Sequence, residues 1–101
     1  MKLLTQELLK EFPKLNETST MDVDKVKIIA KFFCPWNQWT WYATEFDGKD
    51  LFFGYVRGNF NELGYFALSE LKSINGLFGL RIERDMYFGE HTLEEAMNKR
   101  L

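Results

Sequence analysis

Only one cysteine and one histidine are available for nucleophilic or metal chemistry in this 101-residue sequence. Cys34 follows two phenylalanines and His91 precedes a polar turn, so a catalytic Cys–His pair requires the fold to bring them together. A free cysteine in an apolar strand is more typical of a small buried hydrophobe. Because no C-x-x-C or H-E-x-x-H spacing is present, we predict no catalytic residue, no metal site and no cofactor. A zinc site made from Cys34, His91 and nearby acids stays an alternative.

Two pairs of carboxylates offer acid–base chemistry. Glu45 and Asp47 form the first pair, and Glu83 and Asp85 form the second. Residues at positions i and i+2 of a strand point to one face, so each pair would present two acids to a sugar or a water molecule. Acids grouped in this way more often belong to a solvated charged face. A small hydrolase or ligand-binding protein that uses these acids is therefore an alternative function.

Aromatic residues are the most prominent feature of the chain, which has 3 Trp, 4 Tyr and 10 Phe. We expect a single-layered sheet whose short helices cover one face, so that some rings on the other face stay exposed and bind a partner. The candidate aromatic anchors are Trp36, Trp39, Trp41, Tyr42 and Tyr55. The acids expected to be exposed and to meet a basic partner surface are Glu45, Asp47, Asp50, Glu83 and Asp85. For each ring, burial in the core stays the alternative.

Charge and composition narrow the class of partner. The net charge is −2 and the isoelectric point is about 5.4, whereas a protein that tracks phosphates normally has a basic stripe. A protein partner is thus expected and a nucleic acid is not, although a single-strand binder with stacking rings is a further alternative. A single cysteine fits a reducing compartment, and no apolar run is long enough to cross a bilayer. We expect a cytoplasmic protein without a membrane partner, and a homo-oligomer stays open.

Hydrophobic periodicity and cap residues predict the elements that position these side chains. Helices are predicted over Gln6–Phe12, Glu70–Ile74 and Leu93–Arg100, capped by Thr5, Ser69 and Thr92. Strands are predicted over Lys25–Cys34, Gln38–Phe46, Leu51–Arg57, Gly64–Leu68 and Gly79–Phe88. The polar stretch 14–24 is expected to be a flexible loop. The order predicts a single α+β domain over residues 1–101, with a mostly antiparallel five-stranded sheet and helices at the N-terminus, after strand four and at the C-terminus.

Four segments carry a resemblance to a known family. They are Trp39-Thr-Trp-Tyr-Ala-Thr-Glu-Phe-Asp-Gly48, Phe52-Phe-Gly-Tyr-Val56, the run 62–71 and the run 82–88. Together they resemble a family of small bacterial proteins of unknown function that is found on plasmids, conjugative elements and phages. The resemblance implies no established activity and no catalytic residue. It does imply an accessory role, for which an anti-CRISPR or anti-restriction factor that occupies a host nuclease is the leading hypothesis.

Overall fold

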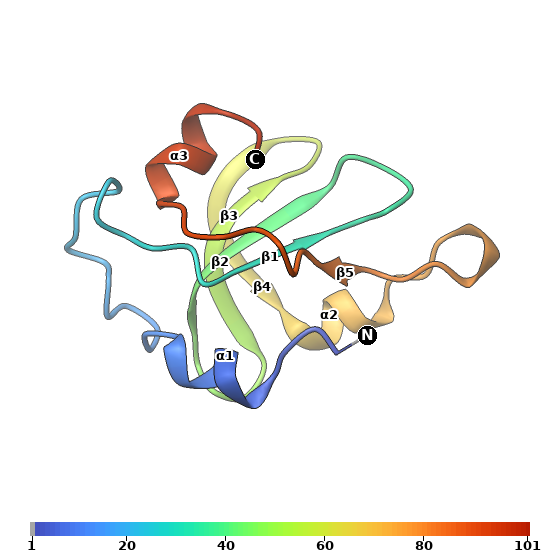
Figure 1. Cartoon of the computed structure of the whole chain (residues 1–101), viewed down its shortest axis with the longest axis horizontal. Helices are drawn as coiled ribbons and strands as arrows, with labels where there is room; N and C mark the ends of the chain where they lie inside the picture. Colours follow the sequence, from blue (N-terminus) through green and yellow to red (C-terminus); the bar gives the residue numbers. More distant parts are fainter. Residues whose placement is uncertain (1) are drawn as a thin grey trace.

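Five antiparallel strands form one sheet at the centre of the molecule (Figure 1). The structure is a computed structural model, and it describes residues 2–101. The strands are β1 (Ala30–Phe33), β2 (Thr40–Phe46), β3 (Leu51–Arg57), β4 (Asn61–Ala67) and β5 (Glu83–Arg84). Their order in the sheet is β4-β3-β2-β1-β5, so consecutive strands are neighbours from β1 to β4. The predicted α+β class with an antiparallel five-stranded sheet is confirmed.

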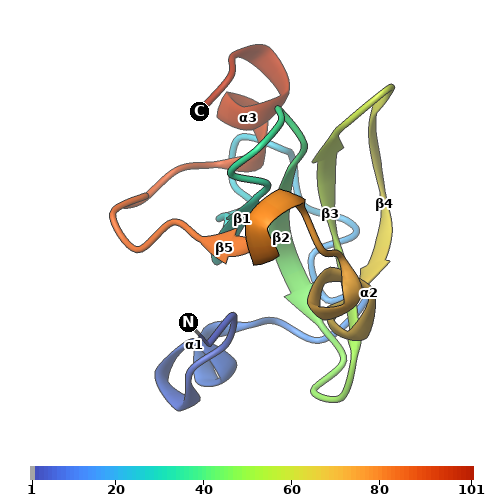
Figure 2. The ribbon, with the colours of Figure 1, turned by 90° about the vertical axis from the view of Figure 1, so that its right-hand side faces the viewer.

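Three short helices accompany the sheet: α1 (Gln6–Glu11), α2 (Leu68–Ser73) and α3 (Leu93–Asn98). The Thr5 hydroxyl accepts the Leu8 N–H at 3.2 Å, which caps α1 as predicted. Thr92 and Glu95 form the predicted capping box of α3. Figure 2 shows α1 and α3 at opposite ends of the sheet. None of the helices described in residues 2–101 is long and apolar enough to cross a membrane.

The predicted cap of α2 is wrong. The helix begins at Leu68, and the Glu70 carboxylate accepts the Ala67 N–H at 3.3 Å. Ser69 instead donates its N–H and its hydroxyl to the two oxygens of Asp50, at 2.8 and 2.7 Å. Because Asp50 lies in the turn immediately before β3, this pair of hydrogen bonds fixes α2 against the β2–β3 hairpin.

Both faces of the sheet carry a buried core, contrary to the expectation that one would be bare, and only the β4 side of the second face stays open, where Leu63 and Tyr65 are 42 % and 56 % exposed. The first face packs beneath α1 and α2 around Phe32, Phe52 and Leu71, each at most 1 % exposed. Phe12 at the end of α1 contacts the rings of Phe46 and Phe52, with centroids 5.7 Å apart in each case. Aromatic rings bury large areas, so this cluster makes the larger of the two cores.

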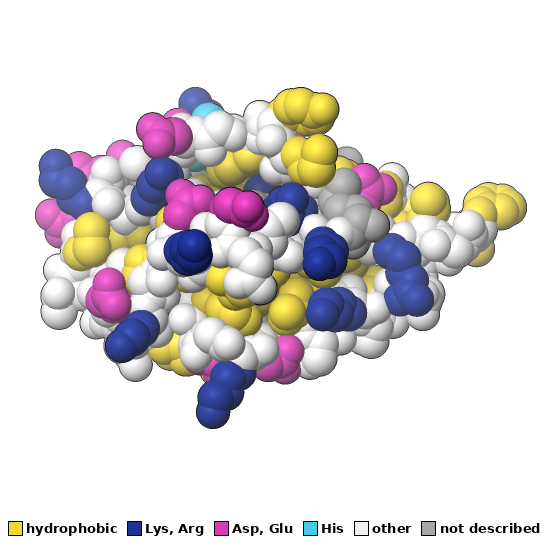
Figure 3. All heavy atoms as spheres, turned by 60° about the horizontal axis from the view of Figure 1, so that its bottom comes forward, with side chains coloured by type: hydrophobic (Ala, Val, Ile, Leu, Met, Phe, Trp, Pro, Cys, Tyr) yellow, Lys and Arg dark blue, Asp and Glu magenta, His cyan; other side chains and the backbone are white. Residues whose placement is uncertain are grey.

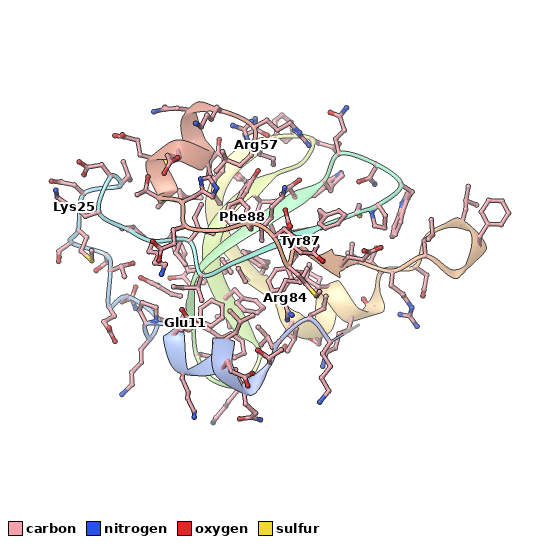
Figure 4. All side chains as sticks on the ribbon, in the orientation of Figure 1. Glu11, Lys25, Arg57, Arg84, Tyr87 and Phe88 are labelled. Carbon is pink, nitrogen blue, oxygen red and sulfur yellow. The ribbon has the colours of Figure 1, made fainter. Side chains whose placement is uncertain are left out.

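The second face is covered by α3 and by side chains from residues before β1 and near the C-terminus, which are Val23, Val26, Ile28, Phe88 and Leu101. Tyr42 and Tyr55 lie side by side on this face, and they pack with Leu93 and Ala96 of α3. Arg57 donates to the Ala96 carbonyl oxygen at 2.7 Å, and Figure 4 shows it beside α3. In this second core, the six-residue helix α3 shields the middle of the seven-residue strand β2.

The first and last predicted strands are shorter than their alternation indicates. Residues 25–28 lie outside the sheet, and Ile28 donates its N–H to the His91 carbonyl oxygen at 2.9 Å, whereas Ile29 still donates to the Ala43 carbonyl oxygen of β2 at 2.9 Å. In the 79–88 segment only Glu83 and Arg84 pair with β1, because β5 lies at the sheet edge and the chain turns away on both sides. The alternation of apolar and polar residues therefore correctly indicates extended backbone in these segments. It does not indicate whether that backbone pairs with another strand.

Arg84 is the charged residue that interrupts the apolar side of the last predicted strand, and its hydrogen bonds explain its position there. Its guanidinium donates to the carbonyl oxygens of Lys2 and Leu3, both at 3.0 Å. Figure 4 labels Arg84 where β5 meets the N-terminal segment. Leu3 is buried in the first core, so these hydrogen bonds hold the N-terminal segment over the end of the sheet.

Candidate functional site

A groove lined by all three tryptophans lies at one end of the first face. Its volume is about 500 Å³, which is within the usual range for ligand sites. It runs between the turn after β1, the strands β3 and β4, and α2. The described residues that line it are Cys34, Trp36, Asn37, Trp39, Trp41, Val56, Glu62, Gly64, Tyr65, Phe66, Glu70, Leu71, Ile74 and Asn75. We call it the tryptophan groove.

Glycines fix the two outer indoles of the groove. A Cβ atom on Gly76 would lie 2.5 Å from the Trp36 ring, and one on Gly58 would lie 2.4 Å from the Trp39 ring. Both indoles therefore pack directly on backbone, which leaves them half-buried with part of each ring facing the groove. Trp41 lies beneath Trp39, with centroids 5.8 Å apart, and is only 6 % exposed. The rings are thus held in place before any partner binds, which lowers the entropic cost of binding.

Carboxylates stand on the wall of the tryptophan groove. The Glu62 carboxylate makes no hydrogen bond or ion pair with any residue in the described chain, and Glu70 uses one oxygen for the Ala67 N–H. Among the described residues that line the groove, none is Lys or Arg. Indole faces attract cations, and free carboxylates pair with them. The groove is therefore suited to an apolar or aromatic group that lies next to a positive charge.

Gly64 keeps the groove open. Residues 62, 64 and 66 share one face of β4, because side chains alternate along a strand. A Cβ atom on Gly64 would meet no other atom within 4 Å. The absence of a side chain at Gly64 therefore leaves free space between Glu62 and Phe66. Neither the backbone conformation nor a close neighbour requires a glycine at this position.

Three of the predicted aromatic anchors belong to the cores. Trp41, Tyr42 and Tyr55 are 6 %, 0 % and 8 % exposed. The Tyr42 hydroxyl donates to the Leu101 carbonyl oxygen at 3.0 Å, and burial raises the pKa of this phenol. Trp41 still forms the floor of the groove, whereas Tyr42 and Tyr55 lie on the other face and do not reach it. Trp36 and Trp39 are the two predicted anchors that keep accessible ring surface.

Glu45 is a buried structural acceptor, contrary to the expectation that it would be exposed. It is 2 % exposed, and its carboxylate accepts the backbone N–H groups of Asn16 and Thr18 at 2.9 and 3.0 Å. The Thr18 hydroxyl also donates to it. The β2 backbone has a bulge between Ala43 and Glu45. Glu45 therefore organises the successive turns of the 14–24 loop.

Asp47 does not join Glu45 in a reactive pair. One of its oxygens accepts the N–H groups of Lys49, Asp50 and Leu51, at 2.8, 2.8 and 3.0 Å. These hydrogen bonds lower the pKa of the Asp47 carboxyl. With Gly48 at φ +84°, they close the β2–β3 hairpin at the predicted turn.

The second acid pair is also divided between different partners. Asp85 lies 3.5 Å from the Lys31 ammonium, and its other oxygen accepts the Tyr87 N–H at 2.9 Å. Glu83 is half-buried at the sheet edge and pairs with Phe33 through the backbone. The predicted acids Glu83, Asp85, Asp47 and Asp50 all lie outside the tryptophan groove.

Cys34 and His91 belong to different parts of the molecule. Cys34 is buried in the first core at the end of the groove, and burial raises the pKa of its thiol. The His91 ring contacts Phe88 on the second face and lies 3.2 Å from Glu95. Within residues 2–101, no three His, Cys, Asp or Glu side chains gather as a metal site would require.

Comparison with protein families gives one match. The model of a family described as "Protein of unknown function (DUF2958)" matches residues 3–97. The chain belongs to the DUF2958 family. No curated protein and no solved structure matches it. For this DUF2958 chain, the family therefore supports the expected membership in a group of unknown function, and the groove is the main guide to activity.

Sequence reasoning missed Glu62, Gly64 and Glu70 as groove residues. The predicted fourth strand began at Gly64, which left Glu62 in a turn, whereas β4 begins at Asn61. A strand extended by three residues would have placed Glu62, Gly64 and Phe66 on one face. Glu70 carries no signal of its own, because its position depends on how α2 folds back against β4.

Proposed function

We propose that this chain is a non-enzymatic protein-binding accessory factor of a mobile genetic element. The tryptophan groove would hold a partner segment that presents an apolar or aromatic side chain beside an Arg or Lys. The observation that carries this proposal is the juxtaposition of half-exposed Trp36 and Trp39 with the unpaired Glu62 carboxylate. Tryptophan is enriched among the residues that dominate binding energy, especially in pockets that exclude water.

The contacts of the predicted acids favour a binding role over hydrolysis. Glu45 and Asp47 are occupied by backbone N–H groups, and Asp85 is paired with Lys31. A general acid or base must reach the reacting atom, and these groups are instead engaged in loops and turns. In the groove, Glu62 and Glu70 line the same wall region as the indoles, and Glu70 uses one oxygen for the Ala67 N–H.

We further propose a host defence nuclease as the partner, bound in an anti-CRISPR or anti-restriction manner. Nucleases present basic surfaces to their substrates, and an acidic groove on a chain of net charge −2 complements such a surface. The resemblance to proteins of plasmids, conjugative elements and phages supports the same setting. Direct nucleic-acid binding is disfavoured by the sign of the charge.

Gly64→Leu tests the groove without removing any contact. The added side chain points into free space, so the variant is expected to fold and to fill the groove. Affinity capture from a bacterial lysate with wild-type and Gly64→Leu chains would identify the proteins that depend on the groove. Calorimetric titration with the purified partner should then show at least about a tenfold loss of affinity in this variant.

A matched control lies next to Gly64 in the same strand. Leu63 points to the opposite face, so Leu63→Ala should bind the partner with unchanged affinity. In a host with an active restriction or CRISPR system, the wild-type chain and Leu63→Ala should raise plasmid establishment, and Gly64→Leu should not. Equal binding by wild-type and Gly64→Leu chains would show that the groove is not the partner site.

A further inference from the structure

A hydrophobic loop projects from the same end of the molecule as the tryptophan groove. Residues 75–81 form this loop, which we call the Phe78 loop; it extends beyond the sheet at the right of Figure 1. Leu77 is 74 % exposed and Phe78 is 99 % exposed. Figure 3 shows the hydrophobic tip standing clear of the rest of the surface. Large apolar side chains gathered at a projecting tip mark an interaction site.

The Phe78 loop has a defined shape. The Gly76 N–H donates to the Leu80 carbonyl oxygen at 2.8 Å, and the Leu80 N–H donates to that of Leu77 at 3.2 Å. A bridge between Asn75 and Arg81 closes its base. Phe78 itself has φ +60° and ψ +26°, a left-handed conformation that is unfavourable for a non-glycine residue. No described residue covers this ring, so the strained backbone at Phe78 gains no side-chain packing within the described chain.

The loop and the groove are neighbours. Gly76 at the base of the loop packs on the Trp36 ring, and Asn75 lines the groove. Figure 2 looks onto this end of the molecule, where the loop comes forward in front of β1 and β2. A projection and a groove that lie side by side can be exchanged between two copies related by a two-fold axis, since each copy then offers both parts.

The charges of the two parts are complementary. Arg81 is exposed at the base of the loop and spends one donor on the Lys72 carbonyl oxygen at 2.7 Å. The groove carries Glu62 and Glu70, and no cation from the described chain lines it. An apolar tip with an adjacent guanidinium is the chemistry that the indoles and carboxylates of the groove are suited to hold.

We propose that two copies of this chain associate reciprocally, with Phe78 of each copy in the tryptophan groove of the other. Arg81 of one copy would pair with Glu62 of its partner. The inference rests on the groove being a binding site, as proposed above. It adds that self-association and binding of the partner protein exclude each other, so the dimer is the form that exists before the partner arrives.

Analytical ultracentrifugation from about 1 to about 500 µM tests the association. The wild-type chain should change from monomer to dimer with rising concentration. Phe78→Ser, which removes an exposed ring, and Gly64→Leu, which fills the groove, should each raise the dimer dissociation constant at least about tenfold. An equimolar mixture of these two variants should recover association, because one intact loop then meets one intact groove.

A charge exchange adds a second test. Glu62→Arg and Arg81→Glu should each weaken the dimer, and the double variant should restore it. A wild-type chain that stays monomeric over the whole concentration range, or a Phe78→Ser chain that dimerises as well as wild type, would overturn the inference. Phe78→Ser leaves the groove open, so its binding of the partner protein reports on the proposed function independently. Circular dichroism of each variant confirms that it is folded.

Discussion

The Glu45 carboxylate accepts the backbone N–H of Thr18 at 3.0 Å, across 27 positions of the sequence. With the Asn16 N–H on the other oxygen, a single buried side chain fixes a loop that has no helix or strand of its own. Without the Glu45 carboxylate, the N–H groups of Asn16 and Thr18 would lose these hydrogen-bond acceptors. The polar 14–24 segment therefore owes its shape to a residue of β2.

Glu45→Gln should destabilise the protein by about 1.5–3 kcal/mol, because hydrogen bonds to a charged acceptor are lost and an amide N–H₂ replaces one oxygen. Urea unfolding followed by tryptophan fluorescence measures this change. Limited proteolysis should also cut the 14–24 loop faster. Glu62→Gln is the matched control, since Glu62 is exposed and unpaired within the described chain, and its unfolding midpoint should stay at the wild-type value.

Tyr42→Phe should lower the free energy of unfolding by about 1 kcal/mol, because the hydroxyl loses its hydrogen bond to the Leu101 carbonyl oxygen while the ring stays packed. Lys31 still donates to that oxygen at 2.8 Å. Tyr65→Phe is the control, since Tyr65 is 56 % exposed. Equal losses in the two variants would contradict the role assigned to the Tyr42 hydroxyl.

The same tyrosine predicts a limit at alkaline pH. Burial raises its folded pKa above the usual value near 10, so the unfolded chain releases the proton first. The stabilisation is complete below the unfolded pKa and is lost as the pH rises toward the folded one. Tyr42→Phe should therefore show a shallower fall in unfolding midpoint above about pH 10 than wild type.

The capping box of α3 predicts behaviour in acid. The Thr92 N–H lies 3.0 Å from the Glu95 carboxylate and His91 contacts its other oxygen, which together lower the pKa of Glu95. A lowered folded pKa means that this stabilisation is present above the unfolded pKa and is lost as the pH falls through the folded one. Between about pH 5 and pH 3, Glu95→Gln should lose less stability than wild type. Glu94→Gln, one position away on the exposed side, should follow the wild-type curve.

Thr92→Ala removes the other half of the same box. The Thr92 hydroxyl accepts the Glu95 N–H at 3.3 Å, and loss of such a cap costs about 1 kcal/mol. Thermal unfolding at neutral pH measures it. Thr20→Ala in the exposed loop is a suitable comparison, and an equal effect there would mean that the cap contributes nothing.

Cys34 should react slowly with thiol reagents in the folded protein. The side chain is 5 % exposed and burial raises the pKa of the thiol, so little thiolate forms at pH 8. Labelling with Ellman's reagent should be at least about tenfold slower in buffer than in denaturant. A bound partner should slow it further, because Cys34 lines the tryptophan groove. Equal rates in the folded and unfolded chain would contradict this burial.

Local signals predicted much of this fold correctly. Thr5, Thr92 and the Asp47-Gly48 turn act over a few residues, and each is found where its pattern placed it. The alternation over residues 25–28 and 79–82 predicts strands, because extended backbone alternates whether or not it is paired. Ile28 donates to the distant His91 carbonyl oxygen, whereas Arg81 pairs with the nearby Asn75. Alternation does not distinguish these cases, so the pairing depends on the assembled fold.

The groove was predicted only in part, for a related reason. Trp36 and Trp39 are predicted as anchors because the segment has more aromatic rings than one face of the sheet needs, and they do line the groove. Tyr42 and Tyr55 looked equivalent in sequence, but α3 folds over them. Whether these rings are buried or exposed depends on where α3, which is distant in the sequence, packs against the sheet. A local sequence pattern does not contain that information.

The hydrogen bonds from Arg84 to the carbonyl oxygens of Lys2 and Leu3 have a consequence for folding during synthesis. These hydrogen bonds join residues 82 and 81 positions apart. Contacts of such long range form late and slow the closure of a domain. During synthesis, residues 2 and 3 can therefore take their final place over the sheet only after Arg84 has left the ribosome.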